Sequence, residues 1–319
     1  MADTRRVIAA LAVGLLCAPG TWLRSPVDAA PPQDVAVSQI AAGIADAAPG
    51  WDVAGVWHYH AEGLRFGGFS ALLALGEGRL RAFSDRGFRL TFAEPGSPEP
   101  RGRMNRQLAT PGLENDLVDI ESATRDPATG RYWIGYEQVH AIERYTIASL
   151  VDGVRLLDEV DWPSNGGIEA MARLSDGRFV IVPEQRATGL IFARDPVEGG
   201  KPATFAVRSP AKGYVATDMT QLPDGRLIVL MRKVEWPSSE AWPPFSTLLA
   251  IGEAPVAGGT FAPRIALRLD NVIPRENYEG LAVRPRDDGR VDVWVMSDDN
   301  FSIFQRTLLA KLVFEPGRN

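Results

Sequence analysis

Short apolar runs recur along the chain, and residues that favour turns separate them. Residues 179–182 and 227–230 are continuous runs of apolar side chains that are too short for a helix and typical of buried strands. Asp-Gly or Thr-Gly pairs lie between successive runs, and glycine accepts the positive φ that a tight turn between antiparallel strands demands. The pattern therefore predicts a series of β-hairpins.

Five segments repeat one order of residues: a polar or acidic residue, an apolar strand, a glycine turn, a second apolar strand and a polar cluster. The leading polar positions are 70, 121, 169, 218 and 279, which lie 51, 48, 49 and 61 residues apart. A period near fifty residues is typical of a four-stranded propeller blade. Strand-like segments at 51–64 and 307–314 flank the repeats. We therefore predict an all-β, six-bladed β-propeller, closed by pairing of the N- and C-terminal strands into the sixth blade.

The start of the chain has the organisation of a secretory signal peptide. Arg5 and Arg6 precede an apolar run that is shorter than the roughly 20 residues needed to cross a bilayer, and small residues follow it. The arginine pair also fits a twin-arginine signal, so the export route stays open. We predict a signal peptide at 1–30, a flexible N-terminal segment at 31–50 and a single propeller domain at 51–319. The protein would be periplasmic or secreted, with no permanent membrane span.

Composition and charge exclude several classes of function. The 34 basic and 40 acidic residues give a formal net charge of −6, so no basic surface is available for nucleic acid. The single cysteine, Cys17, lies in the predicted signal peptide, which leaves the mature chain without a disulfide. Only three histidines are present (His58, His60 and His140), and this scarcity disfavours a zinc hydrolase or a Ser-His-Asp triad.

The polar ends of the predicted hairpins are rich in carboxylates. The first and last polar positions of each repeat straddle one antiparallel hairpin, so they meet at the same end of it. If the first strand of each hairpin is innermost, these side chains converge around the propeller axis. The converging acids would be Asp85, Glu121, Glu137, Glu169, Glu184, Asp218, Glu279, Asp298 and Asp299, beside Arg86 and Arg232. Asp116 and Asp119 precede the second repeat and are further candidates.

Crowded carboxylates need a counter-charge, and a bound cation, salt bridges to the arginines or protonation would each supply relief. Oxygen ligands without sulfur or imidazole suit a hard cation, and calcium tolerates irregular oxygen cages better than magnesium does. We therefore predict a Ca²⁺ site. Its candidate ligands are Asp85, Glu121, Glu169, Asp218, Glu279, Asp298 and Asp299. The alternative is that the repeated acids are structural and accept hydrogen bonds from the neighbouring blade.

Several stretches of the chain resemble the phytase-like, or esterase-like, family of secreted β-propeller proteins. The matching stretches are 67–70, Ser84-Asp85-Arg86-Gly87, 119–121, 165–169, 224–226 with Arg232, Asn277-Tyr278-Glu279-Gly280, Ser297-Asp298-Asp299-Asn300-Phe301 and 307–309. Together they span about residues 64–314. Ser122 and Ala170 depart from the pattern, because each stands where a glycine would follow the glutamate.

The resemblance implies a propeller that hydrolyses phosphate or carboxylate esters of small molecules, with calcium as the usual cofactor. Glu137 and Glu184 would then accept the proton of an attacking water, and Arg86, Arg232 and Asn300 would bind the substrate. The acids expected around the propeller axis form an acidic ring with few arginines, and this charge disfavours a dedicated phytase. A lactonase-like propeller and a non-catalytic propeller that binds a ligand or protein partner remain alternatives.

One insertion departs from the repeat. Residues 233–247 begin at the polar end of the fourth hairpin and carry Trp236, Trp242 and Phe245 among three prolines. A loop in this place either covers a ligand or packs its aromatic side chains onto a neighbouring blade.

Overall fold

A computed structural model describes residues 34–62, 65–97, 102–113, 117–160, 162, 166–183, 187–236 and 242–318. The predicted signal peptide and the candidate acids Asp116 and Glu184 lie outside the described residues. Within the described part, no helix has the length and hydrophobicity needed to cross a membrane.

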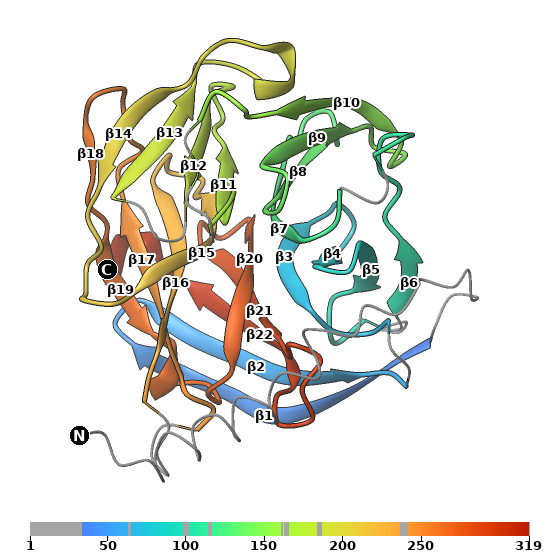
Figure 1. Cartoon of the computed structure of the whole chain (residues 1–319). Coiled ribbons are helices and arrows are strands. Elements are labelled where there is room, and N and C mark those ends of the chain that lie inside the picture. The colour runs from blue at the N-terminus through green and yellow to red at the C-terminus, as the bar shows by residue number, and fades with distance from the viewer. Residues whose placement is uncertain are drawn as a thin grey trace, which may run out of the picture.

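The described strands form antiparallel units of four strands each, arranged around a common centre (Figure 1). The first unit contains β3 (Phe69–Ala74), β4 (Arg79–Ser84), β5 (Phe88–Ala93) and β6 (Gly102–Arg106). The second contains β7 (Ile120–Arg125), β8 (Tyr132–Tyr136), β9 (Ala141–Tyr145) and β10 (Val151–Leu156). The third contains β11 (Ala170–Arg173), β12 (Phe179–Val182), β13 (Thr188–Phe192) and β14 (Ala203–Val207), to which β18 (Thr260–Phe261) adds in parallel.

The fourth unit contains β15 (Val215–Gln221), β16 (Leu227–Val234), β17 (Phe245–Gly252) and β19 (Arg264–Arg268). The fifth contains β20 (Asn277–Pro285), β21 (Val291–Asp298), β22 (Thr307–Phe314) and, from the other end of the chain, β2 (Trp51–His60). The described residues also contain three short 3₁₀ helices, η1 (Pro196–Glu198), η2 (Leu269–Asn271) and η3 (Pro316–Arg318), in connections or at the C-terminal end.

The first strands of the units contact one another in the closed order β3, β7, β11, β15, β20 and back to β3. This arrangement is the predicted all-β propeller, and the predicted pairing of the terminal strands is also present, between β2 and β22. The expected number of blades is wrong for the described residues, which form five units instead of six. The fifth repeat has only three strands of its own, so the N-terminal strand β2 completes that blade instead of starting another.

The segment expected to be flexible, 31–50, contains strand β1 (Asp34–Ala48). β1 pairs with β2 over most of its length and with β6 of the first unit at its start, where Val35 lies opposite Gly102. Val35 is buried among side chains that include Tyr59 and Met104. The strand therefore joins the fifth and first units into one sheet.

Five apolar clusters hold the ring together, and each lies between two neighbouring units. In β16, Leu227 and Val229 pack toward the third unit, whereas Ile228 and Leu230 pack toward the fifth. Successive side chains of a strand point to opposite faces, so a blade between two others is apolar on both. This double burial explains the continuous apolar runs at β12 and β16.

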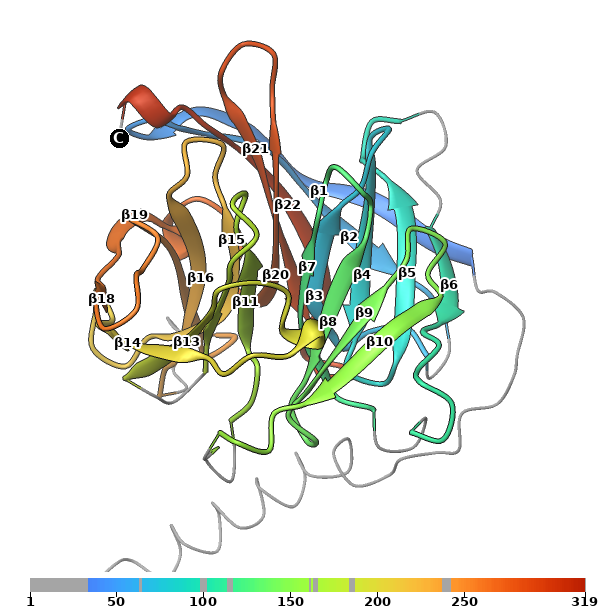
Figure 2. The same cartoon turned by 90° about the horizontal axis from the view of Figure 1, so that it is seen from above.

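The turns between the first and second strands of the blades lie on one side of the molecule, along the upper edge of Figure 2. The other ends of these hairpins carry the polar residues singled out in the repeats. They therefore lie on the opposite face, where the inner strands begin.

Candidate functional site

Four of the five inner strands contain a β-bulge close to the point where they enter the propeller. The pairing register skips one residue in β3, β7, β15 and β20, and the extra residues are Ser70, Glu121, Thr217 and Glu279. In the third unit, Glu169 directly precedes the first paired residue of β11. A bulge re-aims the side chain of its extra residue. Glu121 and Glu279 are thus both bulge residues of an inner strand, and Glu169 lies at the corresponding position of the third unit.

Asp218 does not follow this pattern, although its spacing had suggested that it would. The bulge of β15 is at Thr217, so Asp218 is a paired strand residue, one position further along. Its side chain is completely buried, and its two oxygens accept hydrogen bonds from the backbone N–H groups of Met219 and Leu281, each at 2.7 Å. These contacts support the structural alternative for Asp218, and we do not propose it as a metal ligand.

Asp119, Glu121 and Glu137 bring their carboxylates together at the entrance of the second unit. One oxygen from each lies within 4.8 Å of the others. Backbone hydrogen bonds fix the two flanking residues: the N–H of Glu137 donates to the carbonyl of Asp119 at 3.0 Å, and the N–H of Asp119 donates to the carbonyl of Asp85 at 2.8 Å. Asp119 has a positive φ of 72°, a conformation that aspartate tolerates better than most residues do.

The other acids of the ring act on this cluster electrostatically. Burial raises the pKa of Glu121 well above its ordinary value, and the charges of Glu169, Glu279, Asp119 and Glu137 raise it further. The sequence-predicted acids Glu121, Glu137, Glu169 and Glu279 therefore share one site. Asp119 completes it; in the sequence it was a further candidate before the second repeat and part of the matching stretch 119–121.

Asp85 and Asp298 belong to the same electrostatic group. Burial raises the pKa of Asp85 to about 7; the charges of Asp119 and Glu279 add to this effect, while Arg86 opposes it. Burial, followed by the charges of Glu279, Asp85 and Asp299, raises the pKa of Asp298 well above its usual range. A ring of carboxylates in these surroundings favours protonation or a bound cation.

An arginine supplies part of the counter-charge. Arg232 pairs with Glu279 and also donates to the Asn277 side-chain oxygen at 2.6 Å. The Asn277 amide in turn donates to Glu279 at 2.9 Å. Glu279 is thus held by two partners, and the salt-bridge alternative describes it better than it describes Glu121.

Asp299 has an organising role at the edge of the ring. Its carboxylate accepts hydrogen bonds from the N–H groups of Gly68 and Phe301, both at 3.0 Å, and from the Thr307 hydroxyl at 2.9 Å. Gly68 has a φ of 66°, and a β-carbon there would lie 2.4 Å from an Asp85 oxygen. Only glycine permits this close approach.

The two other predicted substrate-binding residues differ in their surroundings. The Arg86 guanidinium lies 3.2 Å from the centre of the Phe301 ring, which fixes it next to Asp85. Asn300 is exposed, and its side-chain amide donates to Gln305 of the same loop at 2.8 Å. Arg86 is therefore placed for binding at the ring, whereas the Asn300 amide is engaged within its own loop.

The donor set of Asp119, Glu121 and Glu137 fits calcium. Calcium–oxygen distances are about 2.3–2.6 Å, so two ligand oxygens of one ion lie at most about 5.2 Å apart. The three carboxylate oxygens satisfy this limit, and they are hard donors of the kind that calcium prefers.

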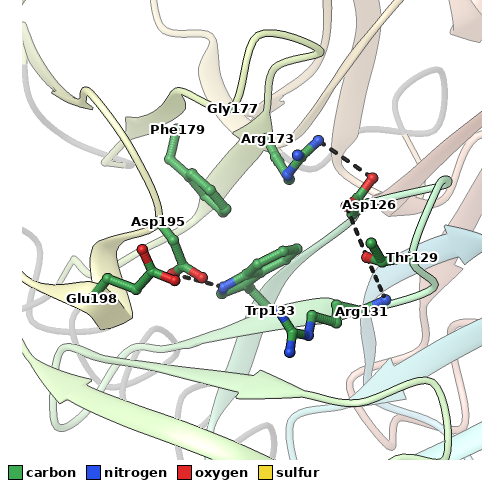
Figure 3. A pocket seen from close by; sticks show the side chains of 9 residues that line it. All are labelled: Asp126, Thr129, Arg131, Trp133, Arg173, Gly177, Phe179, Asp195 and Glu198. Carbon is green, nitrogen blue, oxygen red and sulfur yellow. Dashed lines mark hydrogen bonds and ion pairs between the residues drawn. The ribbon is translucent and has the colours of Figure 1, made fainter.

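A cavity of about 200 Å³ lies at the opposite face, between the second and third units (Figure 3). Asp195 accepts hydrogen bonds there from the Trp133 indole at 3.0 Å and from Arg144 at 2.7 Å. Asp126 lies 3.5 Å from Arg173. These acids are already matched by donors within the cavity wall, which makes the axial ring the stronger candidate site.

Comparisons with known proteins identify the family but no individual relative. A search of curated protein sequences found no match. Among solved structures, the chain is similar to a luciferin-regenerating enzyme (10% identity, 89% of this chain and 96% of that chain, TM-score 0.48). It is also similar to an exo-1,5-α-L-arabinanase from a bovine ruminal metagenomic library (10%, 78% and 95%, 0.49) and to the WD40 β-propeller domain of Doa1 (12%, 84% and 77%, 0.42).

The family comparison is more specific. Residues 64–301 match the phytase-like family model, which is described as esterase-like activity of phytase. The match covers most of the chain and includes the acidic ring, so this protein belongs to the phytase-like family.

Proposed function

We propose that the protein is an exported, calcium-dependent hydrolase of phosphate or carboxylate esters, with its active site at the acidic ring. The observation that supports this most directly is the approach of the Asp119, Glu121 and Glu137 oxygens to within 4.8 Å of one another. Three carboxylates in partly buried positions are costly without a cation, and the cost is offset when a cation binds.

Asp119, Glu121 and Glu137 would hold the calcium, with Glu169 as a neighbouring carboxylate. The assignment moves Glu137 from the expected role of proton acceptor to that of ligand. Bound calcium would neutralise charge on the ester oxygens and lower the pKa of the attacking water.

The remaining residues of the ring would bind the substrate and take up a proton. Arg86 and Arg232 lie at the ring, and a guanidinium can donate two parallel hydrogen bonds to ester oxygens. Phe301 limits the motion of Arg86. Asp85, whose pKa is raised to about 7 by burial and by Asp119 in the absence of a cation, would accept a proton of the attacking water.

The charge of the ring bears on the substrate. Among the described residues, Arg86 and Arg232 face a larger number of carboxylates, so a ligand with many phosphates would meet net repulsion. A substrate with a single ester group suits the site better, which favours a monoester or carboxyl ester over phytate.

A calcium titration tests the proposal. Calcium should raise the Tm, EGTA should reverse the rise, and hydrolysis of 4-nitrophenyl acetate or 4-nitrophenyl phosphate should require calcium. Glu121→Gln should lose the Tm response and lower kcat/KM by about 10²-fold or more, because it removes a charged ligand.

Glu253→Gln is the matched control, since Glu253 is exposed and follows β17 on the opposite face. It should behave like the wild type in both measurements. Hydrolysis that is insensitive to EGTA, or no hydrolysis of either ester with calcium present, would refute the proposal.

A further inference from the structure

We propose that an apolar rim beside the acidic ring binds the hydrophobic group of the substrate, so that the protein prefers esters of medium-chain or aryl carboxylic acids. The rim consists of Val234, Trp236, Trp242, Ile303 and Phe304. This inference rests on the proposed ester hydrolysis and adds a substrate class to it.

The rim residues are strongly exposed to water. The exposed fractions are 89% for Trp236, 55% for Trp242, 92% for Ile303 and 67% for Phe304. Trp236 and Trp242 are therefore not buried against a neighbouring blade. Apolar side chains exposed as a group, rather than singly, typically mark a binding surface.

Two separate connections build the rim. Val234 ends β16 and Trp236 follows it, and Trp242 lies shortly before β17 in the fourth unit. Ile303 and Phe304 lie between β21 and β22 in the fifth. The rings of Trp242 and Phe304 meet edge to face, with their centres 6.5 Å apart. This contact joins the two connections, so exposed apolar side chains extend from the fourth blade to the fifth.

The same connections begin at the acidic ring. Trp236 comes four residues after Arg232, and Phe304 comes six residues after Asp298. A chain of six residues spans at most about 20 Å, so Phe304 lies no further than this from Asp298. Val234 comes two residues after Arg232 in β16, so the rim begins about 7 Å from that arginine along the strand. Aromatic side chains also lie next to both arginines of the ring: Phe245 is 5.9 Å from the Arg232 guanidinium, and Phe301 covers Arg86.

This arrangement selects for a particular kind of ester. The ring would take the polar ester group, and the rim would take an alkyl or aryl substituent out of water. Water would add to the carbonyl carbon, and the bond from that carbon to the alcohol oxygen would break. The alcohol would leave with one proton of the water, and Asp85 would take the other, giving a carboxylate product. A small acetyl ester would use the ring alone and gain nothing from the rim.

Two esters with the same leaving group test the inference. With calcium present, kcat/KM for 4-nitrophenyl octanoate should exceed that for 4-nitrophenyl acetate by about tenfold or more, because additional methylene groups are buried. The double variant Trp236→Ser/Phe304→Ser should lose about tenfold on the octanoate and less than twofold on the acetate. The control Ile147→Ser changes a residue that is 72% exposed in the β9–β10 turn on the opposite face, and it should change neither value.

A binding measurement without turnover separates this inference from the proposed function. Octanoate should shift tryptophan emission to shorter wavelengths as Trp236 and Trp242 leave water, whereas acetate should not, and the double variant should lose the shift. If the shift occurs but neither of these esters nor 4-nitrophenyl phosphate is cleaved, the proposed hydrolysis fails and binding by the rim stands. Similar kcat/KM values for the two carboxyl esters, or no emission shift with octanoate, would contradict the proposal that the rim binds the hydrophobic group of the substrate.

Discussion

The Asp218 carboxyl is completely buried and is held by backbone donors. It accepts hydrogen bonds from Met219 in its own strand and from Leu281 and Leu72 in β20 and β3. Glu121, at the corresponding place in the second repeat by spacing, instead faces other carboxylates. The difference is the position of one bulge residue, since a shift by one residue turns a strand side chain to the opposite face.

Asp218→Ala should therefore act on stability. Loss of the carboxyl leaves buried N–H groups in three strands without an acceptor, and we expect the free energy of unfolding to fall by about 3–5 kcal/mol. Urea unfolding followed by tryptophan fluorescence measures this. Asp158→Ala, at an exposed position, is the control and should change the free energy by less than about 0.5 kcal/mol. Equal effects of the two substitutions would contradict the structural role of Asp218.

At the scale of elements, β1 has the most specific role. It pairs with β2 of the fifth unit along its length and touches β6 of the first unit only near Val35. An edge strand with unpaired backbone groups invites association with other chains, and β1 covers part of the β6 edge. The strand therefore links the two ends of the ring as well as extending a blade.

Val35→Ala tests this link. The substitution should lower the free energy of unfolding by about 1–2 kcal/mol, because it removes buried methyl groups from the cluster between the fifth and first units. Ile40→Ala on the same strand is the matched control: Ile40 is exposed, so its truncation should cost less than about 0.5 kcal/mol. Chemical denaturation of both variants measures the two losses of stability. A smaller loss for Val35→Ala than for Ile40→Ala would contradict the proposed role of β1 as a link between the fifth and first units.

At the scale of the whole molecule, carboxylates gather at one end of the propeller axis, and the free energy of unfolding should therefore depend on pH. The pKa of Asp85 is raised from 3.8 to about 7 by burial and by Asp119, so the folded state binds this proton more tightly than the unfolded state does. The stabilisation is complete below about pH 4 and is lost as the pH rises through 7. Burial likewise raises the pKa values of Glu121 and Asp298.

In EGTA, the free energy of unfolding should therefore fall more steeply between pH 4 and pH 7 in the wild type than in Asp85→Asn, which has no proton to lose there. Calcium should flatten the wild-type curve, since a cation favours the ionised ring. Turn acids such as Asp176 and Asp224 have lowered pKa values, so their opposite contribution falls below this range. Parallel curves for wild type and Asp85→Asn in urea titrations would contradict the prediction.

The local pattern of the chain determined the hairpins and the common end at which their polar residues meet. Apolar runs and glycine turns act within a few residues, so the strands at 179–182 and 227–230 and the gathering of Glu121, Glu169 and Glu279 follow from sequence alone. The matched stretches around Asp85 and Asp298 also place the chain in its family, since they lie within residues 64–301.

Tertiary structure decided what depends on contacts between distant segments. The number of blades depends on which strand β2 pairs with, and β2 pairs with β22 of the fifth repeat, which has only three strands of its own. The separation of Asp218 from the ring depends on a bulge at Thr217, and the pairing of Arg232 with Glu279 joins two blades. The local sequence does not determine the register of a strand or its pairing partner. Alternative registers and partners differ in packing and in hydrogen bonds that form only when the ring closes.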